Sequence, residues 1–110
     1  KRWFLNSLVS KTNFFLIGEL DRHKFGVCRF DISNDQKSSL ISINLDPKFR
    51  GQGLGVKLLQ KSTKIFKELY QIELIAKVKK KNIASIKIFE RCNFKKVQSY
   101  MESVEFILPP

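Results

Sequence analysis

The order of apolar and polar positions predicts a chain of short strands interrupted by two helices. Residues 14–20 and 25–32 are rich in aromatic and β-branched side chains and flank the turn-prone residues 21–24, which is typical of a β-hairpin. Residues 39–45 form a third strand of the same kind, which Pro47 ends. Later apolar runs predict strands over residues 72–78, 94–100 and 104–108.

The two faces of these strands differ in polarity. In the second strand Cys28 and Phe30 share an apolar face, whereas Arg29 and Asp31 share the other, so that second face is wet or lines a cleft. In the third strand the apolar side carries Ile41, Ile43 and Leu45, and the polar side carries Ser42 and Asn44.

Two segments show helical periodicity. From Gly55 to Tyr70 apolar residues recur on one side and lysines on the other, which is most simply a solvated face. The apolar set is Leu58, Leu59, Ile65, Phe66 and Leu69, and the lysines are Lys57, Lys61, Lys64 and Lys67. Asn82 is expected to cap a second helix that runs to about Cys92. Its inner face would hold Ile83, Ile86 and Phe89.

The first residues suggest the end of another element. Trp3, Phe4 and Leu8 fit one side of a short helix, which the polar residues 10–13 would end. The chain begins with Lys1 rather than Met, which favours a piece of a longer protein.

Composition bounds the size of the fold and hints at partners. The 110 residues carry 21 Lys and Arg against 10 Asp and Glu, a formal net charge of +11, and 43% of them are hydrophobic. These values predict one globular domain over residues 1–110, with no apolar run of the roughly 18 to 20 residues that a membrane-spanning helix needs. The charge favours nucleic acid, anionic lipid or a phosphorylated small molecule without choosing among them. Cys28 and Cys92 are far apart, which favours free thiols in a reducing, cytoplasmic compartment.

The most informative motif is the run Arg50-Gly51-Gln52-Gly53-Leu54-Gly55 between a strand and a helix. Glycines allow backbone N–H groups to approach an anion closely, and a helix N-terminus adds unpaired donors, so the run predicts a pyrophosphate cradle. It lacks the Gly-Lys-Ser/Thr of a Walker loop and the wider spacing of a dinucleotide fingerprint. An ordinary glycine-rich turn between strand and helix is the competing interpretation.

Together with a second motif, this run resembles the GCN5-related N-acetyltransferase (GNAT) superfamily. Arg50, Gly53 and Gly55 match its R/Q-x-x-G-x-G/A loop, and residues 82–94 resemble its N-x-x-A/S-x-x-x-Y-x-x-x-G-F element. The resemblance implies an α+β, three-layer fold in which a mixed, mostly antiparallel sheet is flanked by helices. It also implies that the superfamily's first strand and first helix are missing before Lys1.

A narrower resemblance is to acetyltransferases that modify nucleotide-linked amino sugars for bacterial surface polysaccharides. It is carried by Trp3, Phe4 and Leu8, and by residues 26–31, 45–47 and 84–90. It implies an acetyl-CoA-dependent transfer of acetyl to a primary amine of an amino sugar nucleotide. Alternatives are acetylation of a protein N-terminus or lysine, or a non-catalytic basic module that binds CoA or nucleic acid. The aromatic spacing of RNA-recognition motifs is absent, which makes nucleic acid the weaker partner.

The superfamily resemblance implies roles for particular residues. The pantetheine arm would pair with backbone from Ile43 to Leu45, the diphosphate would lie on the amides from Gln52 through Val56, and the Leu45 N–H would stabilise the oxyanion. The implied cofactor-binding set is Ile43, Leu45, Arg50, Gly51, Gln52, Gly53, Leu54, Gly55, Val56, Asn82, Ser85 and Phe89. Asn82 caps its helix, contacts the cofactor, or does both.

Two positions depart from the superfamily pattern. Phe89 stands where a tyrosine often protonates the departing thiolate, so that role falls to water, another residue or nobody. Asn93 replaces a glycine, although Asn also tolerates the left-handed conformation that follows a helix.

A general base is less clearly indicated than the cofactor loop. Asp31, Asp46 and His23 are the candidates, and each also reads as a solvated or turn-forming residue. Lone His23 and the separated cysteines give no metal-ligand spacing, so no metal is expected.

Overall fold

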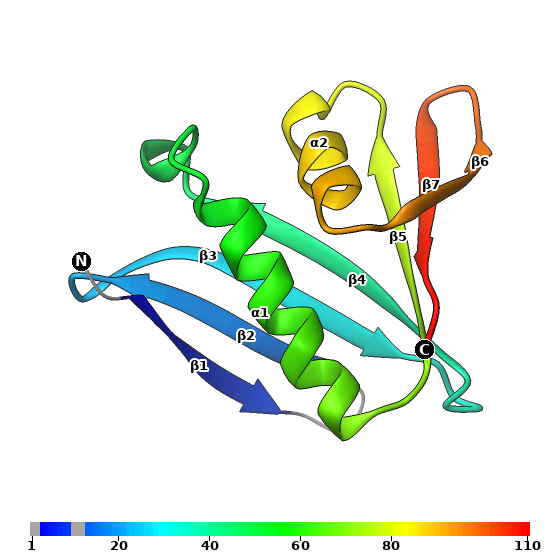
Figure 1. Cartoon of the computed structure of the whole chain (residues 1–110), viewed down its shortest axis with the longest axis horizontal. Coiled ribbons are helices and arrows are strands. Elements are labelled where there is room, and N and C mark those ends of the chain that lie inside the picture. Colours follow the sequence, from blue (N-terminus) through cyan, green and yellow to red (C-terminus); the bar gives the residue numbers. More distant parts are fainter. Residues whose placement is uncertain (1–2, 10–12) are drawn as a thin grey trace.

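The computed structural model describes residues 3–9 and 13–110. This part of the chain contains seven strands and two α-helices, with a short 3₁₀ helix after the fourth strand (Figure 1). The strands are β1 (Trp3–Val9), β2 (Asn13–Leu20), β3 (His23–Ile32), β4 (Ser38–Leu45), β5 (Glu73–Lys79), β6 (Lys95–Ser99) and β7 (Ser103–Leu108). The helices are η1 (Pro47–Phe49), α1 (Leu54–Leu69) and α2 (Ile83–Arg91).

The strands form one mixed sheet in the order β1-β2-β3-β4-β5-β7-β6. Neighbours among β1 to β4 are antiparallel, as are β5, β7 and β6, whereas β4 and β5 run parallel. Parallel neighbours need a long crossover, and α1 provides it between β4 and β5. The α+β fold with a mixed, mostly antiparallel sheet is therefore confirmed.

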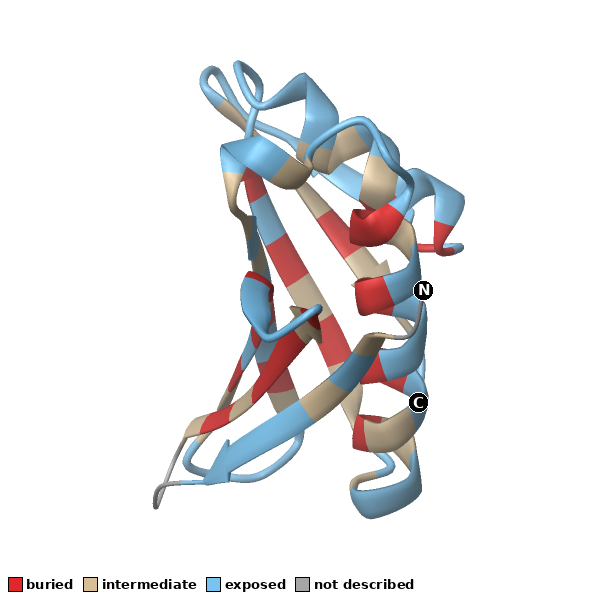
Figure 2. Cartoon of the chain, turned by 90° about the vertical axis from the view of Figure 1, so that its left-hand side faces the viewer, coloured by how far each residue is buried: buried red, intermediate tan, exposed pale blue. Residues whose placement is uncertain are grey.

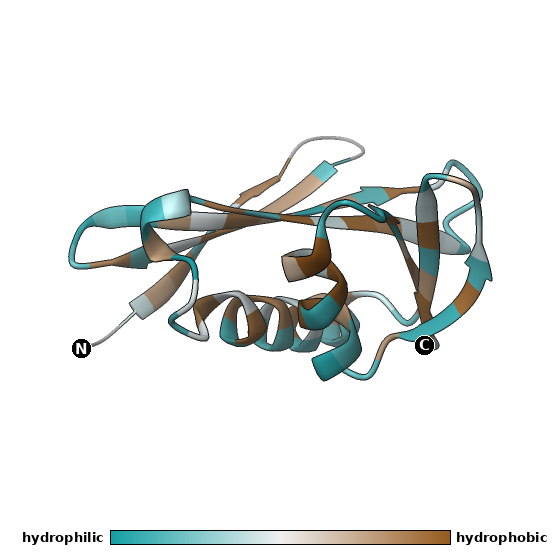
Figure 3. Ribbon diagram, turned by 90° about the horizontal axis from the view of Figure 1, so that it is seen from above, coloured by the Kyte–Doolittle hydropathy of each residue, from teal (hydrophilic) through white to brown (hydrophobic). Residues whose placement is uncertain are grey.

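Both α-helices lie on the same side of the sheet, so the described residues form two layers and not the three that the resemblance implies (Figure 3). The core fills the space between that side and α1, and buried positions alternate along the inner strands (Figure 2). Its centre is aromatic: the rings of Phe30 and Phe66 stack with centroids 4.3 Å apart. The predicted inner residues Leu58, Leu59 and Phe66 of α1 are fully buried. No described helix meets the length and hydropathy needed to cross a membrane.

The predicted short helix near the start is wrong. Residues Trp3–Val9 form β1, which pairs antiparallel with β2 at the edge of the sheet. In this strand Trp3 packs edge-on against Phe25 on the core side, with ring centroids 5.7 Å apart, while Phe4 and Leu8 are exposed. Pairing satisfies the backbone groups of this segment that face β2, so tertiary contact overrides a weak helical pattern.

Two residues that were predicted to lie on inner helix faces are exposed instead. Leu69 is 62% exposed and Ile83 is 61% exposed. Leu69 is the last residue of α1 and Ile83 is the first of α2, so both lie at helix ends. The row on the outside of α1 is exposed at Lys57, Lys61 and Lys64, whereas Lys67 is half-buried and donates to the carbonyl of Pro109 at 2.6 Å.

Candidate active site

A cleft opens where β4 and β5 separate. Their pairing is confined to Ser38↔Glu73, Ser39↔Leu74 and Leu40↔Ile75. Beyond these pairs the two strands diverge, and α2 lies beside the gap (Figure 1). The rest of β4, from Ile41 to Leu45, is paired with β3 alone.

The backbone of β4 directs alternate N–H groups into this gap. Asp46 N–H donates to the carbonyl of Phe25 at 2.8 Å, so at that position the N–H points toward β3. Successive residues of an extended strand direct their N–H groups to opposite sides, so the N–H groups of Leu45 and Ile43 point away from β3. The expected backbone oxyanion donor and pantetheine partner therefore face the cleft.

The glycine loop ends at the first turn of α1. Gly51 and Gly53 have φ values of +80° and +74°, in the left-handed region that favours glycine. Gly53 is the N-cap of α1 and offers no side-chain hydrogen bond. The first N–H of the helix to find an intrahelical acceptor is that of Lys57, which donates to Gly53 at 3.3 Å. The N–H groups of residues 54–56 are thus available to an anion.

Gly55 lets α1 approach β4 and α2 closely. A Cβ atom there would lie 2.6 Å from Ile88 Cδ1 and 2.8 Å from Leu45 Cδ1. The thiol of Cys92 also donates to the carbonyl of Val56 in the first turn of α1, at 3.7 Å. These contacts hold α2 against the glycine loop and make one wall of the cleft.

Two cavities lie along the cleft. The first, of about 290 Å³, lies between the end of β4, the glycine loop and α2. The second, of about 450 Å³, lies between the separating strands. Both are lined by Ile43, Arg50, Asn82 and Ser85.

Most of the residues predicted to bind the cofactor line these cavities. They are Ile43, Leu45, Arg50, Gly51, Gly53, Gly55, Val56, Asn82 and Ser85 in the first cavity, and Phe89 in the second. Asn82 caps α2 by accepting from Ser85 N–H at 3.1 Å, so capping and cavity lining fall to the same side chain. Phe89 is 1% exposed and packs edge-on against Phe94. It has no hydroxyl that could protonate a departing thiolate.

Gln52 and Leu54 do not line either cavity. The amide of Gln52 donates to the carbonyl of Lys48 at 3.4 Å, and the side chain of Leu54 is buried in the core. Any part that these two residues take in the cradle is therefore limited to their backbone N–H groups.

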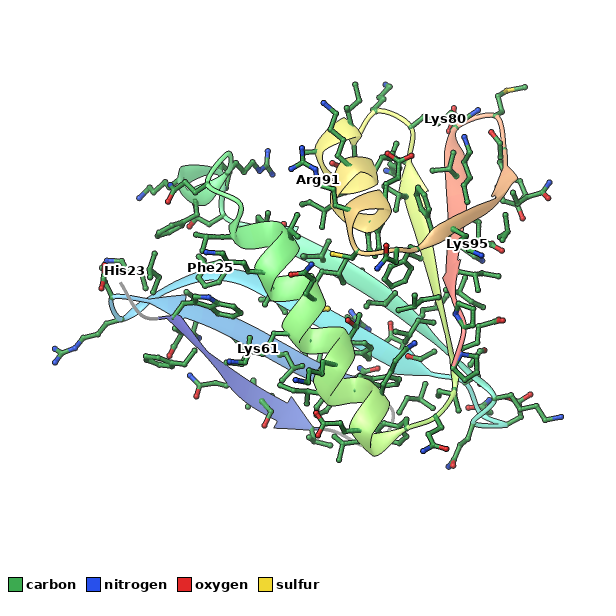
Figure 4. The ribbon with its side chains drawn as sticks, in the orientation of Figure 1. His23, Phe25, Lys61, Lys80, Arg91 and Lys95 are labelled. Atoms are coloured by element: carbon green, nitrogen blue, oxygen red, sulfur yellow. The ribbon has the colours of Figure 1, made fainter. Side chains whose placement is uncertain are left out.

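The three candidate bases are engaged elsewhere, and none lines either cavity. Asp46 caps η1 by accepting from Lys48 N–H at 2.9 Å. Asp31 forms an ion pair with Arg29 at 3.0 Å and lies opposite Leu40, five residues along β4 from Leu45 or about 17 Å at the rise of a strand. His23 lies at the outer end of the β2–β3 hairpin, far from Arg91 on α2 (Figure 4).

Sequence reasoning missed the cations of the cleft. Arg50 was predicted, but Lys87 and Arg91 also line the first cavity. Lys77, Lys79 and Lys81 line the second. The run of lysines at the end of β5 was the available signal, and it reads as ordinary solvation until β4 and β5 are known to separate beside it.

No aspartate, glutamate or histidine is among the residues that line the two cavities. Within residues 3–9 and 13–110, no group of three or more His, Cys, Asp or Glu side chains could hold a metal ion. The arrangement suits an elongated anionic ligand whose diphosphate lies on the first turn of α1 and whose arm runs along β4. These features fit a ligand of the acyl-CoA type.

Comparison with known proteins gives the family. A sequence profile described as "Acetyltransferase (GNAT) family" matches residues 2–94. The chain therefore belongs to the GNAT acetyltransferase family, whose enzymes take acetyl from acetyl-CoA. No curated protein sequence matches the chain significantly.

Solved structures agree with this fold. The N-acetyltransferase PseH of Campylobacter jejuni, in complex with acetyl coenzyme A, has a TM-score of 0.76 at 20% identity over 91% of this chain and 70% of that one. A spermidine N-acetyltransferase SpeG variant from Vibrio cholerae gives 0.77 at 13% identity, over 89% and 64%. The ribosomal-protein-S5-alanine acetyltransferase from Vibrio fischeri gives 0.76 at 14% identity, over 89% and 62%. The chain thus spans less than two thirds of the last two proteins.

Proposed function

We propose that this chain acetylates the primary amine of a nucleotide-linked amino sugar, in the biosynthesis of bacterial surface polysaccharide. The observation that carries the proposal is the charge of the cleft. Its walls hold six cationic side chains, and no carboxylate or imidazole lines them. The six are Arg50, Lys77, Lys79, Lys81, Lys87 and Arg91.

This charge favours an anionic acceptor over a cationic one. Acetyl-CoA accounts for part of the positive field, because its phosphates lie on the glycine loop and α1 in the proposed complex. A polyamine would be repelled by the remaining cations, whereas a sugar that carries a nucleoside diphosphate would be attracted. The stretches that resemble amino-sugar acetyltransferases support the same substrate class.

The absence of a carboxylate from the described cleft lining also bears on the amine. A lysine amine, with an ordinary pKa near 10.4, is almost fully protonated at pH 7 and needs a base. Electron-withdrawing oxygens on a sugar ring lower the pKa of its amine, so a larger fraction arrives neutral. Such an acceptor can lose its proton to water after attack, without a protein base.

Bound acetyl-CoA supplies an activated thioester. The N–H groups of residues 54–56 and Arg50 hold its diphosphate, and β4 pairs with its arm through the N–H of Ile43. The N–H of Leu45 faces the gap and stabilises negative charge that grows on the carbonyl oxygen in the transition state. Positioning of the two reactants provides most of the remaining rate gain.

A second candidate is acetylation of a protein N-terminus. An α-amino group has an ordinary pKa of about 7.7 to 8.0, so it also arrives partly neutral without a base. Both activities fit a cytoplasmic enzyme, and the buried free thiols of Cys28 and Cys92 support that location.

A panel of amines separates the candidates. Purified chain and acetyl-CoA are incubated with a UDP-linked amino sugar, the free amino sugar, peptides with free N-termini, a lysine peptide and spermidine, and CoA release is measured. The corresponding N-acetylated sugar nucleotide, which has no amine, controls for hydrolysis. We expect the UDP-linked amino sugar to give a kcat/KM at least about 100-fold above every other amine. Acetylation of peptides without acetylation of any nucleotide-linked sugar would disprove the proposal.

A further inference from the structure

The second cavity reaches the sheet face that the helices leave uncovered. In β5 the residues Leu74, Ala76 and Val78 are buried toward α1 and α2. Because strand side chains alternate, Lys77 and Lys79 point to the opposite face. Both are exposed, and both line the second cavity. Ser42 of β4, which also lines it, is on that same outer face.

Two further cations complete the cluster from other segments. Lys81 lies in the turn between β5 and α2, and Arg50 lies in the glycine loop; both line the same cavity. The four side chains thus come from a strand, a turn and a loop that the fold brings around one opening. Lys57 and Lys64 of α1, by contrast, are exposed and line neither cavity.

One carboxylate lies near this cluster without forming an ion pair with it. Glu105 of β7 is directly opposite Lys77 in the sheet, yet the two do not come within ion-pair distance. Lys79 is opposite Ser103. Four cations with no carboxylate among the cavity lining repel one another unless an anion lies between them.

We propose that Lys77 and Lys79, with Lys81 and Arg50, form a phosphate-binding subsite for the acceptor on the outer face of the sheet. This inference deepens the proposed function and rests on it. Acetyl-CoA then occupies the helix side of the cleft, on the glycine loop and α2, while the acceptor approaches from the opposite face. Its diphosphate contacts the lysines of β5, and its amine enters the gap beside β4, where the N–H of Leu45 points.

Access from two faces explains why the cations fall into two groups. Lys87 and Arg91 line the first cavity alone, whereas Lys77, Lys79 and Lys81 line the second alone. Arg50 lines both, so it lies between the two proposed anions. A single phosphate-rich ligand would not need a cationic group on the face away from the glycine loop.

The test uses UDP, which carries the diphosphate of the acceptor but no amine. UDP is titrated by calorimetry into the chain saturated with CoA, so that the glycine loop is already occupied. The variant is Lys77→Gln/Lys79→Gln. The matched control is Lys57→Gln/Lys64→Gln, which removes the same charge from the exposed outer side of α1. CoA affinity is measured for all three proteins.

We expect the cleft variant to bind UDP about 10- to 100-fold more weakly than wild type, with CoA affinity changed less than about twofold. The control should match wild type for both ligands, and added salt should weaken UDP binding by wild type more than by the cleft variant. UDP binding that is absent in wild type, or equal in wild type and the cleft variant, would overturn the subsite. So would a parallel loss of CoA affinity, which would assign these lysines to the cosubstrate.

The subsite and the proposed function fail in different ways. Transfer of acetyl to a UDP-linked amino sugar tests the function, and lysine-dependent UDP binding tests the subsite. If UDP binds through Lys77 and Lys79 while no sugar nucleotide is acetylated, the subsite stands and the acceptor is another phosphorylated amine. If the sugar nucleotide is acetylated equally by wild type and Lys77→Gln/Lys79→Gln, with equal KM, the function stands and the subsite falls.

Discussion

At Ser38–Leu40 strand β4 is paired on both sides, with β3 and with β5, whereas at Ile41–Leu45 it is paired with β3 alone. At the first end the sheet is continuous across β4, and Ser39 there is 1% exposed. The second end leaves backbone donors facing a gap that cationic and glycine residues surround. In the proposed function one strand therefore serves stability at one end and ligand binding at the other, because a donor committed to a ladder is not available to a ligand.

If the open end binds a diphosphate, an added carboxylate in the loop should have the largest effect. Gly53→Glu places a negative charge at the N-cap of α1, beside the N–H groups that would bind the diphosphate. It also forces a residue with a side chain into a left-handed conformation. We expect acetyl-CoA affinity to fall at least about 100-fold by calorimetry. Gln60→Glu, which adds the same charge at an exposed position of α1, is the control. Equal affinities for the two variants would mean that the loop does not hold phosphate.

The donor of Leu45 offers a sharper test of the open end. Proline at this position removes an N–H that faces the gap and leaves the hydrogen bonds to β3 in place. We expect Leu45→Pro to lower kcat about 100-fold for whichever amine the panel identifies, because one oxyanion donor is worth about that much.

Leu45→Ala controls for lost packing against Gly55 and keeps the N–H. We expect it to retain kcat within about tenfold of wild type. If Leu45→Ala and Leu45→Pro have the same kcat, the backbone donor is not catalytic.

In β2, which is paired on both sides and lies two strands away from β4, the same size of change should affect stability alone. Gly18 of β2 lies under the fully buried ring of Phe25, and a Cβ there would lie 2.8 Å from Phe25 Cε2. Such overpacking typically costs about 1–3 kcal/mol. We therefore expect Gly18→Ala to lower the urea midpoint, with Ser7→Ala on the exposed edge strand unchanged. A Gly18→Ala protein of normal stability that binds acetyl-CoA poorly would contradict the division between the two regions.

The smallest effect concerns the thiol of Cys28, behind the open end of β4. Burial raises the pKa of Cys28 from 9.0 to about 12. The folded state thus keeps the proton that the unfolded state loses above pH 9. The contribution of this thiol to the free energy of unfolding is therefore present below pH 9 and is lost as the pH rises toward 12. We expect a loss of about 1 kcal/mol in the free energy of unfolding between pH 8 and pH 10. Cys28→Val should lose less over the same range in urea denaturation, and an equal loss would show that the thiol is not linked to stability.

The sequence by itself determined most of the elements and the glycine loop. Strands β2 to β5 and helix α1 begin and end within two residues of their predicted bounds, because aromatic and β-branched alternation and helical periodicity are local signals. The loop was predictable for a similar reason. Its left-handed glycines come directly before an amphipathic helix, so the whole signal lies in adjacent residues. The segment Trp3–Val9 was not, since its strand exists through pairing with β2.

Only the tertiary structure decided what lines the cleft. The separation of β4 from β5 depends on contacts among elements far apart in sequence, so nothing local marks Ile41 as the residue where pairing stops. The same separation gives Lys77 and Lys79 a cavity to line and leaves Asp31 and Asp46 outside it. A lysine on a solvated face and a lysine beside a cleft look alike in sequence, because their difference lies in the groups that the fold brings around them.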